Sequence, residues 1–147
     1  MRTQIAILLF LLVSCTDALG GSSRDEVAWA KSPDGRVHAI LLETNGGATT
    51  SFGYLIELHP ADHQGEKPVN AGSLYGAVRS DCAYGIDLHW NDANTLVLRF
   101  DSAKKMDVPA SVTVAGKRIR IAVEDGMKNE SAPCGGMAAN RVAANGS

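Results

Sequence analysis

Cysteine and aromatic residues are scarce in this 147-residue chain, and neither positive nor negative charge is in large excess. Three cysteines are too few for a disulfide-rich scaffold, and their spacing forms no zinc module. Aromatic residues make up 5%, so a platform for stacking bases or sugars is not expected. The balance of 14 Lys and Arg against 16 Asp and Glu argues against a nucleic-acid binder that relies on a basic face. The remaining composition, 45% hydrophobic and 20% charged, predicts one folded domain.

Residues 1–14 have the pattern of a signal peptide and not of a folded segment. Arg2 gives a positive start, and the nine apolar residues 5–13 are too few to cross a bilayer as a helix. Residues 12–15, with the sequence Leu-Val-Ser-Cys, resemble a bacterial lipobox. That resemblance implies cleavage before Cys15 and acylation of its thiol, which would anchor the protein in a membrane.

Two other interpretations of this segment stay open. An ordinary secretory signal would be cleaved after Ala18, because residues 16–18 form a small-x-small site, and a retained transmembrane anchor is the third possibility. Thr16, and not Asp, follows the cysteine, which favours the outer membrane facing the periplasm over the inner membrane; a Gram-positive surface is the alternative. Cleavage removes Arg2 and leaves 13 basic against 16 acidic residues, so the lipid must hold the protein to the membrane.

The body of the chain predicts an all-β fold, a small antiparallel sandwich or open barrel of about seven strands. No segment keeps the 3.6-residue period of a helix, whereas period-2 alternation is clear, with Tyr54, Ile56 and Leu58 on one face. A Ser-Pro-Asp-Gly turn at 32–35 joins the first two strands. We expect strands at 27–30, 37–43, 54–59, 74–79, 86–90, 96–100, 111–114 and 119–123.

Polar and glycine-rich segments flank this predicted domain, which spans residues 27–125. Residues 15–26 are expected to be the lipidated N-terminus and a flexible tether. Residues 126–147 are rich in Gly, Ala, Asn and Ser, which predicts a disordered tail.

Several motifs in this body resemble a group of small bacterial lipoproteins that share a domain without an assigned function. The Ser-Pro-Asp-Gly turn is followed by Gly-Gly-Ala-Thr-Thr-Ser-Phe-Gly-Tyr at 46–54, and later by Ile-Asp-Leu-His-Trp at 86–90 and Thr-Leu-Val-Leu-Arg-Phe at 95–100. The resemblance covers roughly residues 32–123. It implies a location in the cell envelope and a fold, and it implies no reaction.

The glycine-rich segment is the candidate binding edge. Its residues are Asn45, Gly46, Gly47, Thr49 and Thr50. Paired glycines followed by small hydroxylated residues can form a backbone nest or an edge that pairs with a partner strand. A structural need for positive φ is the simpler explanation of the glycines.

Two cysteines remain once Cys15 is lipidated or removed, and an even number in an oxidising compartment favours pairing. We therefore predict a disulfide between Cys82 and Cys134. Free thiols, or pairing between molecules through Cys134, are the alternatives.

Other groups with catalytic or ligand potential give no stronger signal. His59, Asp62 and His63 are the only local cluster of metal-ligand atoms, but Pro60 and the absence of further ligands favour a solvated loop, so no metal is predicted. No nucleophile motif is present, and no cofactor is expected. His38 and His89 are interpreted as half-exposed strand residues and Trp29 and Trp90 as packing residues. For Arg118 and Arg120 a solvated face is favoured over an anion site, which is the alternative.

The sequence therefore predicts a lipid-anchored envelope protein that is not an enzyme and that binds or supports an envelope protein partner. The alternative is an inhibitor or immunity protein directed against a periplasmic hydrolase or toxin.

Overall fold

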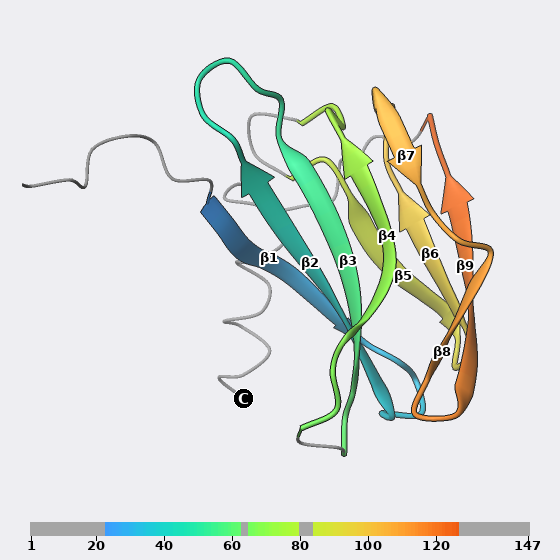
Figure 1. Cartoon of the computed structure of the whole chain (residues 1–147). Coiled ribbons are helices and arrows are strands. Elements are labelled where there is room, and N and C mark those ends of the chain that lie inside the picture. Colours follow the sequence, from blue (N-terminus) through green and yellow to red (C-terminus); the bar gives the residue numbers. More distant parts are fainter. Residues whose placement is uncertain (1–22, 63–64, 80–83, 127–147) are drawn as a thin grey trace, which may run out of the picture.

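The computed structural model describes residues 23–62, 65–79 and 84–126, which form nine strands in two sheets. The sheets pack face to face as a sandwich (Figure 1), which confirms the predicted all-β class. Sheet A has the strand order β1 (Ser23–Lys31), β2 (Val37–Asn45), β3 (Gly53–Pro60), β4 (Val69–Tyr75) and β7 (Lys105–Asp107). Sheet B has the order β5 (Asp87–Asp92), β6 (Thr95–Arg99), β9 (Lys117–Glu124) and β8 (Ser111–Val114).

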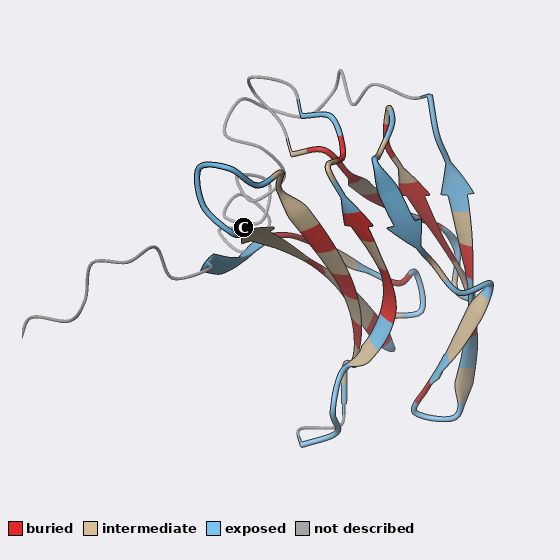
Figure 2. Ribbon diagram, turned by 45° about the horizontal axis from the view of Figure 1, so that its top comes forward, coloured by how far each residue is buried: buried red, intermediate tan, exposed pale blue. Residues whose placement is uncertain are grey.

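The core lies between the facing sides of the two sheets, where Figure 2 places most of the buried residues. The predicted inward faces are confirmed, because the residues between the buried ones are more exposed. The buried residues are Tyr54, Ile56 and Leu58 on β3 and Leu88 and Trp90 on β5. The Trp90 indole N–H donates to the Ala30 carbonyl at 3.0 Å, which links the edge strands of the two sheets. The fully buried large side chains are Tyr54, Leu41, Ile56, Leu58, Leu74, Ile86, Leu96, Leu98, Ile119, Val37 and Val114.

The predicted turn at 32–35 joins β1 to β2. Gly35 has a φ of 73° and donates its backbone N–H to the Ser32 carbonyl at 2.8 Å. Asp34 accepts hydrogen bonds from Ser32 and from the Arg36 backbone N–H, and the side chain of Lys117 on β9 reaches it as an ion pair. The hydrogen bonds from Lys117 and Ser32 hold the pKa of the Asp34 carboxyl well below its ordinary value.

β1 begins earlier than predicted and includes the last residues that we assigned to the flexible tether. Residues 23–26 pair with β2 from Ser23 opposite Asn45 to Glu26 opposite Leu42. Their side chains are exposed because β1 is an edge strand of sheet A, so polar residues are tolerated there. β1 therefore begins four residues before Val27, where the sequence places the start of the domain.

The other differences concern β4, β7 and the connection between sheets. The segment predicted at 74–79 ends at Tyr75, and β4 instead starts at Val69 and contains a bulge opposite β3. Gly72 lies at that bulge with a φ of 146°, and a Cβ there would meet a Val108 side-chain carbon at 2.9 Å. The short strand β7 was not predicted, and β6 pairs with β9 in parallel, so the fold is not purely antiparallel.

Candidate functional site

The predicted binding segment forms the loop between β2 and β3, at the end of the sandwich where β1 starts (Figure 1). Asn45 ends β2 and accepts the Gly47 backbone N–H at 2.9 Å. The backbone N–H and the hydroxyl of Thr50 both donate to the Gly47 carbonyl, at 3.1 and 3.0 Å. Gly47 has a φ of 105°, which supports the structural explanation for this glycine.

This loop presents no free strand edge. β2 and β3 are both interior strands of sheet A, and Asn45 already lies opposite Ser23 of β1. A partner strand therefore cannot pair with β2 or β3 here, and binding has to use the exposed loop itself. Gly46, Gly47, Thr49 and Thr50 are all exposed, so their role in binding stays a prediction.

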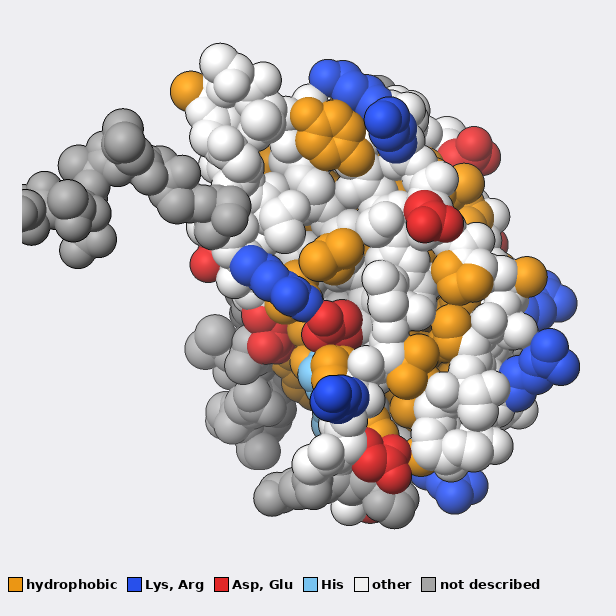
Figure 3. All heavy atoms as spheres, in the orientation of Figure 1, with side chains coloured by type: hydrophobic (Ala, Val, Ile, Leu, Met, Phe, Trp, Pro, Cys, Tyr) orange, Lys and Arg blue, Asp and Glu red, His pale blue; other side chains and the backbone are white. Residues whose placement is uncertain are grey.

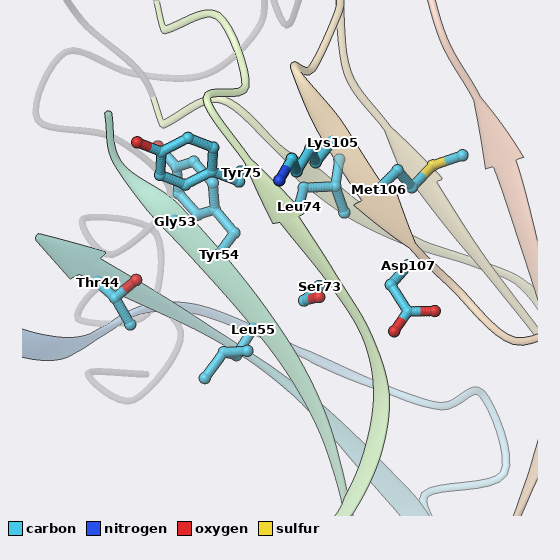
Figure 4. Close-up of a pocket in the computed structure, with 10 residues that line it drawn as sticks. All are labelled: Thr44, Gly53, Tyr54, Leu55, Ser73, Leu74, Tyr75, Lys105, Met106 and Asp107. Atoms are coloured by element: carbon cyan, nitrogen blue, oxygen red, sulfur yellow. The ribbon is translucent and has the colours of Figure 1, made fainter. Parts of the chain in front are cut away.

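A groove of about 520 Å³ lies beside the loop on the outer face of sheet A (Figure 4). Its floor contains Gly53 and Ser73, which lie on β3 and β4. A Cβ on Gly53 would lie 2.5 Å from the Thr44 hydroxyl oxygen, so a larger residue here would require the Thr44 side chain to move. The complete lining is Thr44, Gly53, Tyr54, Leu55, Ser73, Leu74, Tyr75, Lys105, Met106 and Asp107.

The groove and the loop are held together by Tyr75 and Ser51. Tyr75 is 40% exposed, and its hydroxyl accepts the Ser51 backbone N–H at 3.1 Å. The Lys104 ammonium donates to the Ser51 hydroxyl at 2.7 Å. The hydrogen bond from Ser51 lowers the pKa of Tyr75. We call the loop 45–51 and the groove lining together the loop–groove surface.

A buried polar network that the sequence did not predict lies behind this surface. Tyr54 is fully buried; its hydroxyl donates to a Glu43 carboxylate oxygen at 2.8 Å and accepts the Gly85 backbone N–H at 3.1 Å. Burial raises the pKa of Tyr54 far above its ordinary value, so the phenol stays neutral and keeps its donor proton. The network joins β2 and β3 to the segment that leads into β5.

Arg79 closes the network from the outside. Its Nε lies 3.7 Å from the Glu43 carboxylate, and its guanidinium lies 4.2 Å from the Phe52 ring centre and 5.5 Å from that of Tyr84. These contacts are cation–π interactions, which fix the guanidinium between two aromatic rings. Phe52 directly follows Ser51, so the network also supports the end of the loop.

We expect Tyr54→Phe to lower the free energy of unfolding by about 2 kcal/mol, because it leaves the buried Gly85 N–H without an acceptor and removes a donor from Glu43. Urea denaturation at pH 7 measures the change. Tyr75→Phe is the matched control, since it removes the hydroxyl of an exposed tyrosine and should cost less than about 1 kcal/mol. Equal losses in the two variants would contradict a special role for the buried hydroxyl.

The chemistry of the groove suits binding. Lys105 supplies an ammonium group and Asp107 a carboxylate to the groove lining, and they lie on β7 opposite Tyr75 and Ser73, respectively. The other lining groups that reach the groove are hydroxyls, apolar side chains and backbone. Figure 3 shows this face with hydrophobic side chains between polar ones, and with Lys and Arg side chains near its upper rim.

The remaining predicted residues do not join this site. His38 lies opposite His59 on the outer face of sheet A, stacked on Trp29, and burial lowers the pKa of His38. Across the ranges that the structure describes, no group of three or more His, Cys, Asp or Glu is placed to hold a metal ion, and no helix is long and apolar enough to cross a membrane. His63, Cys15, Cys82 and Cys134 lie outside the described residues, so the predicted lipid and disulfide stay predictions.

Comparison of the chain with models of protein families, with curated proteins and with solved structures finds no match. The resemblance to small bacterial lipoproteins therefore stays a prediction that rests on the motifs alone.

Proposed function

We propose that this chain is a lipid-anchored protein of a bacterial cell envelope that acts by binding an envelope partner through the loop–groove surface, without catalysing a reaction. The observation that carries the proposal is the position of Ser23. It starts the first strand and lies opposite Asn45, next to the loop.

The distance from the predicted lipid supports this arrangement. Seven residues separate Cys15 from Ser23. At about 3.5 Å for each extended residue, they span at most roughly 25 Å. A domain on so short a tether stays close to the membrane, with the end that carries the loop–groove surface near the lipid. A partner in or beside the same membrane would meet this surface first.

The composition of the surface supports binding in preference to catalysis. The groove places Tyr75 and Leu55 on one side and Lys105 and Asp107 on the other, with Ser73 between the two sides (Figure 4). Such a shallow channel with an exposed aromatic residue accommodates an extended segment of a partner. Its hydroxyl groups come from Thr44, Ser73 and Tyr75, and no histidine is among its lining residues to act as their general base.

The test is chemical cross-linking of the full chain in envelope membranes, followed by identification and quantification of the partner. Ser73→Arg places a long side chain in the groove without entering the core, because Ser73 is half-exposed on the outer face. We expect this variant to lose most of the cross-linked partner, and Thr49→Ala with Thr50→Ala to weaken it while stability changes by less than about 1 kcal/mol. His89→Arg, an exposed position on β5, is the matched control and should keep the partner.

A partner captured equally by the wild type and the Ser73→Arg variant would contradict the loop–groove surface as the binding site. Turnover of an envelope substrate by the purified chain would contradict a purely binding role. A single stoichiometric partner that is a hydrolase or toxin, and that loses activity when bound, would support the inhibitor alternative.

A further inference from the structure

A second hollow of about 500 Å³ lies on sheet B, at the opposite end of the sandwich from the loop–groove surface. It is formed where the start of β6 and the short strand β8 flank β9. Three of its lining residues are cationic and none is acidic. The lining is Asn94, Thr95, Ala110, Ser111, Lys117, Arg118 and Arg120. Figure 3 shows Lys and Arg side chains along the margin over β8 and β9.

Arg118 and Arg120 are two residues apart on β9 and exposed, whereas Ile119 between them is fully buried. Their side chains therefore project from the same outer face, about 7 Å apart along the strand. Thr95 and Ser111 lie directly opposite Arg120 on the two neighbouring strands. Two guanidinium groups and two hydroxyl groups thus surround one small area.

The carboxylates near this area have partners other than Arg118 and Arg120. Glu124 lies on the same face of β9, but its carboxylate accepts the Arg99 Nε–H at 2.8 Å. Asp34 forms an ion pair with Lys117, one of the three lining cations, and Asp92 accepts hydrogen bonds from the Asn94 backbone N–H at 2.7 Å and from the Thr95 side chain. Within the described ranges, no ion pair joins Arg118 or Arg120 to a carboxylate of this chain.

The position of Arg118 is also fixed in advance. Its Nε–H donates to the Ser111 hydroxyl at 3.2 Å, which holds the guanidinium over the hollow and leaves its terminal N–H groups free to bind. Such preorganisation reduces the entropy that a ligand must overcome on binding.

We propose that this hollow binds a phosphate group, with Arg118 and Arg120 as paired guanidinium ligands and with Ser111 as a hydroxyl partner. A phosphate carries up to two negative charges and enough oxygens to accept hydrogen bonds from two guanidinium groups on opposite sides. A carboxylate has one charge and two oxygens, so it satisfies one guanidinium group well but not both. The site is separate from the loop–groove surface and does not depend on the proposed function.

The test is an NMR titration of the full chain in a non-ionic detergent with inorganic phosphate, at constant ionic strength set by sodium chloride. We expect saturable shifts in the signals of Ser111, Arg118 and Arg120. Arg118→Ala and Arg120→Ala should each weaken the affinity at least about tenfold, since each removes charge-assisted hydrogen bonds. Arg36→Ala is the control with the same change of charge, because Arg36 is exposed and is not among the residues that line this hollow.

A parallel titration with sodium acetate distinguishes phosphate from carboxylate recognition. Weaker binding of acetate than of phosphate supports the proposal, and equal or tighter binding of acetate overturns it. Shifts that stay linear with phosphate concentration, or that persist in both arginine variants, also overturn it. Urea denaturation of each variant confirms that the fold is kept, because both side chains are exposed and neither contributes to the core.

Discussion

Replacing Cys15 by alanine should move the protein from the membrane fraction to the soluble fraction, or stop its processing altogether. Each buried CH₂ of an acyl chain contributes about 0.8 kcal/mol to membrane attachment, and two or more chains hold a protein stably. The chain expected after cleavage has 13 basic against 16 acidic residues, so attraction to anionic lipids would not replace the predicted lipid. Fractionation of cells and incorporation of labelled fatty acid measure the change.

Ser14→Ala is the matched control for this experiment. It keeps a small residue before the cysteine, so processing and labelling should match those of the wild type. Mature wild-type protein that begins at Leu19 and carries no label would show that residues 1–18 are an ordinary secretory signal, and the lipid anchor would then be excluded.

Loss of the predicted bridge between Cys82 and Cys134 should lower the free energy of unfolding by about 4 kcal/mol. The bridge would close a loop of about 53 residues, and closing a loop of that length removes this much conformational entropy from the unfolded chain. Small domains are stable by only about 5–15 kcal/mol, so the loss would be a large share of the total. Urea denaturation with and without a reductant measures the difference.

Two described residues that precede the cysteines by four and eight positions bond to neighbouring residues of one segment. Val78 donates its backbone N–H to the Ser102 carbonyl at 2.9 Å, and Gly126 donates to the adjacent Asp101 carbonyl at 2.7 Å. Cys82 and Cys134 themselves lie outside the described residues, so the bridge is predicted from the sequence. Cys134→Ser should cost as much stability as the double replacement of both cysteines. Two thiols that react with an alkylating reagent in the native protein would contradict the bridge.

The hairpins and buried faces could be predicted from the sequence because each follows from neighbours along the chain. Alternation places Ile86, Leu88 and Trp90 on one side, and the structure buries all three. The turn at 32–35 has the residues that its backbone requires, including a glycine at positive φ. These features depend on local spacing and turn chemistry.

The missed features depend on contacts between distant segments. β7 has three exposed residues and exists because it pairs with β4, so its sequence alone carries no apolar signal. The bulge at Gly72 interrupts the alternation that would have located β4. A parallel pair such as β6 and β9 leaves no mark in either strand, because alternation is the same for both directions of pairing.

The candidate site likewise has a part that local sequence predicts and a part that depends on contacts between distant segments. The loop could be located from its glycines and threonines, but the groove beside it needs Gly53, Ser73 and Lys105 from three strands of sheet A. The network of Tyr54, Glu43 and Arg79 was not predicted, because the alternation pattern identifies Tyr54 only as a core residue. The one signal in the sequence was that the predicted inward position 54 holds a tyrosine, because a buried tyrosine hydroxyl needs hydrogen-bond partners.

The pairing of β9 with β6 and β8 also determines which truncated chains can complete the fold. The last strand of the fold lies inside sheet B, between β6 and β8. A nascent chain that ends before Lys117 already contains all of sheet A, but β6 and β8 lack the strand that joins them, and the core lacks Ile119 and Ile121. Premature stop codons upstream of Lys117 should therefore give aggregation-prone products with open strand edges. The core and sheet B can therefore be completed only after the ribosome has synthesised β9 through Glu124.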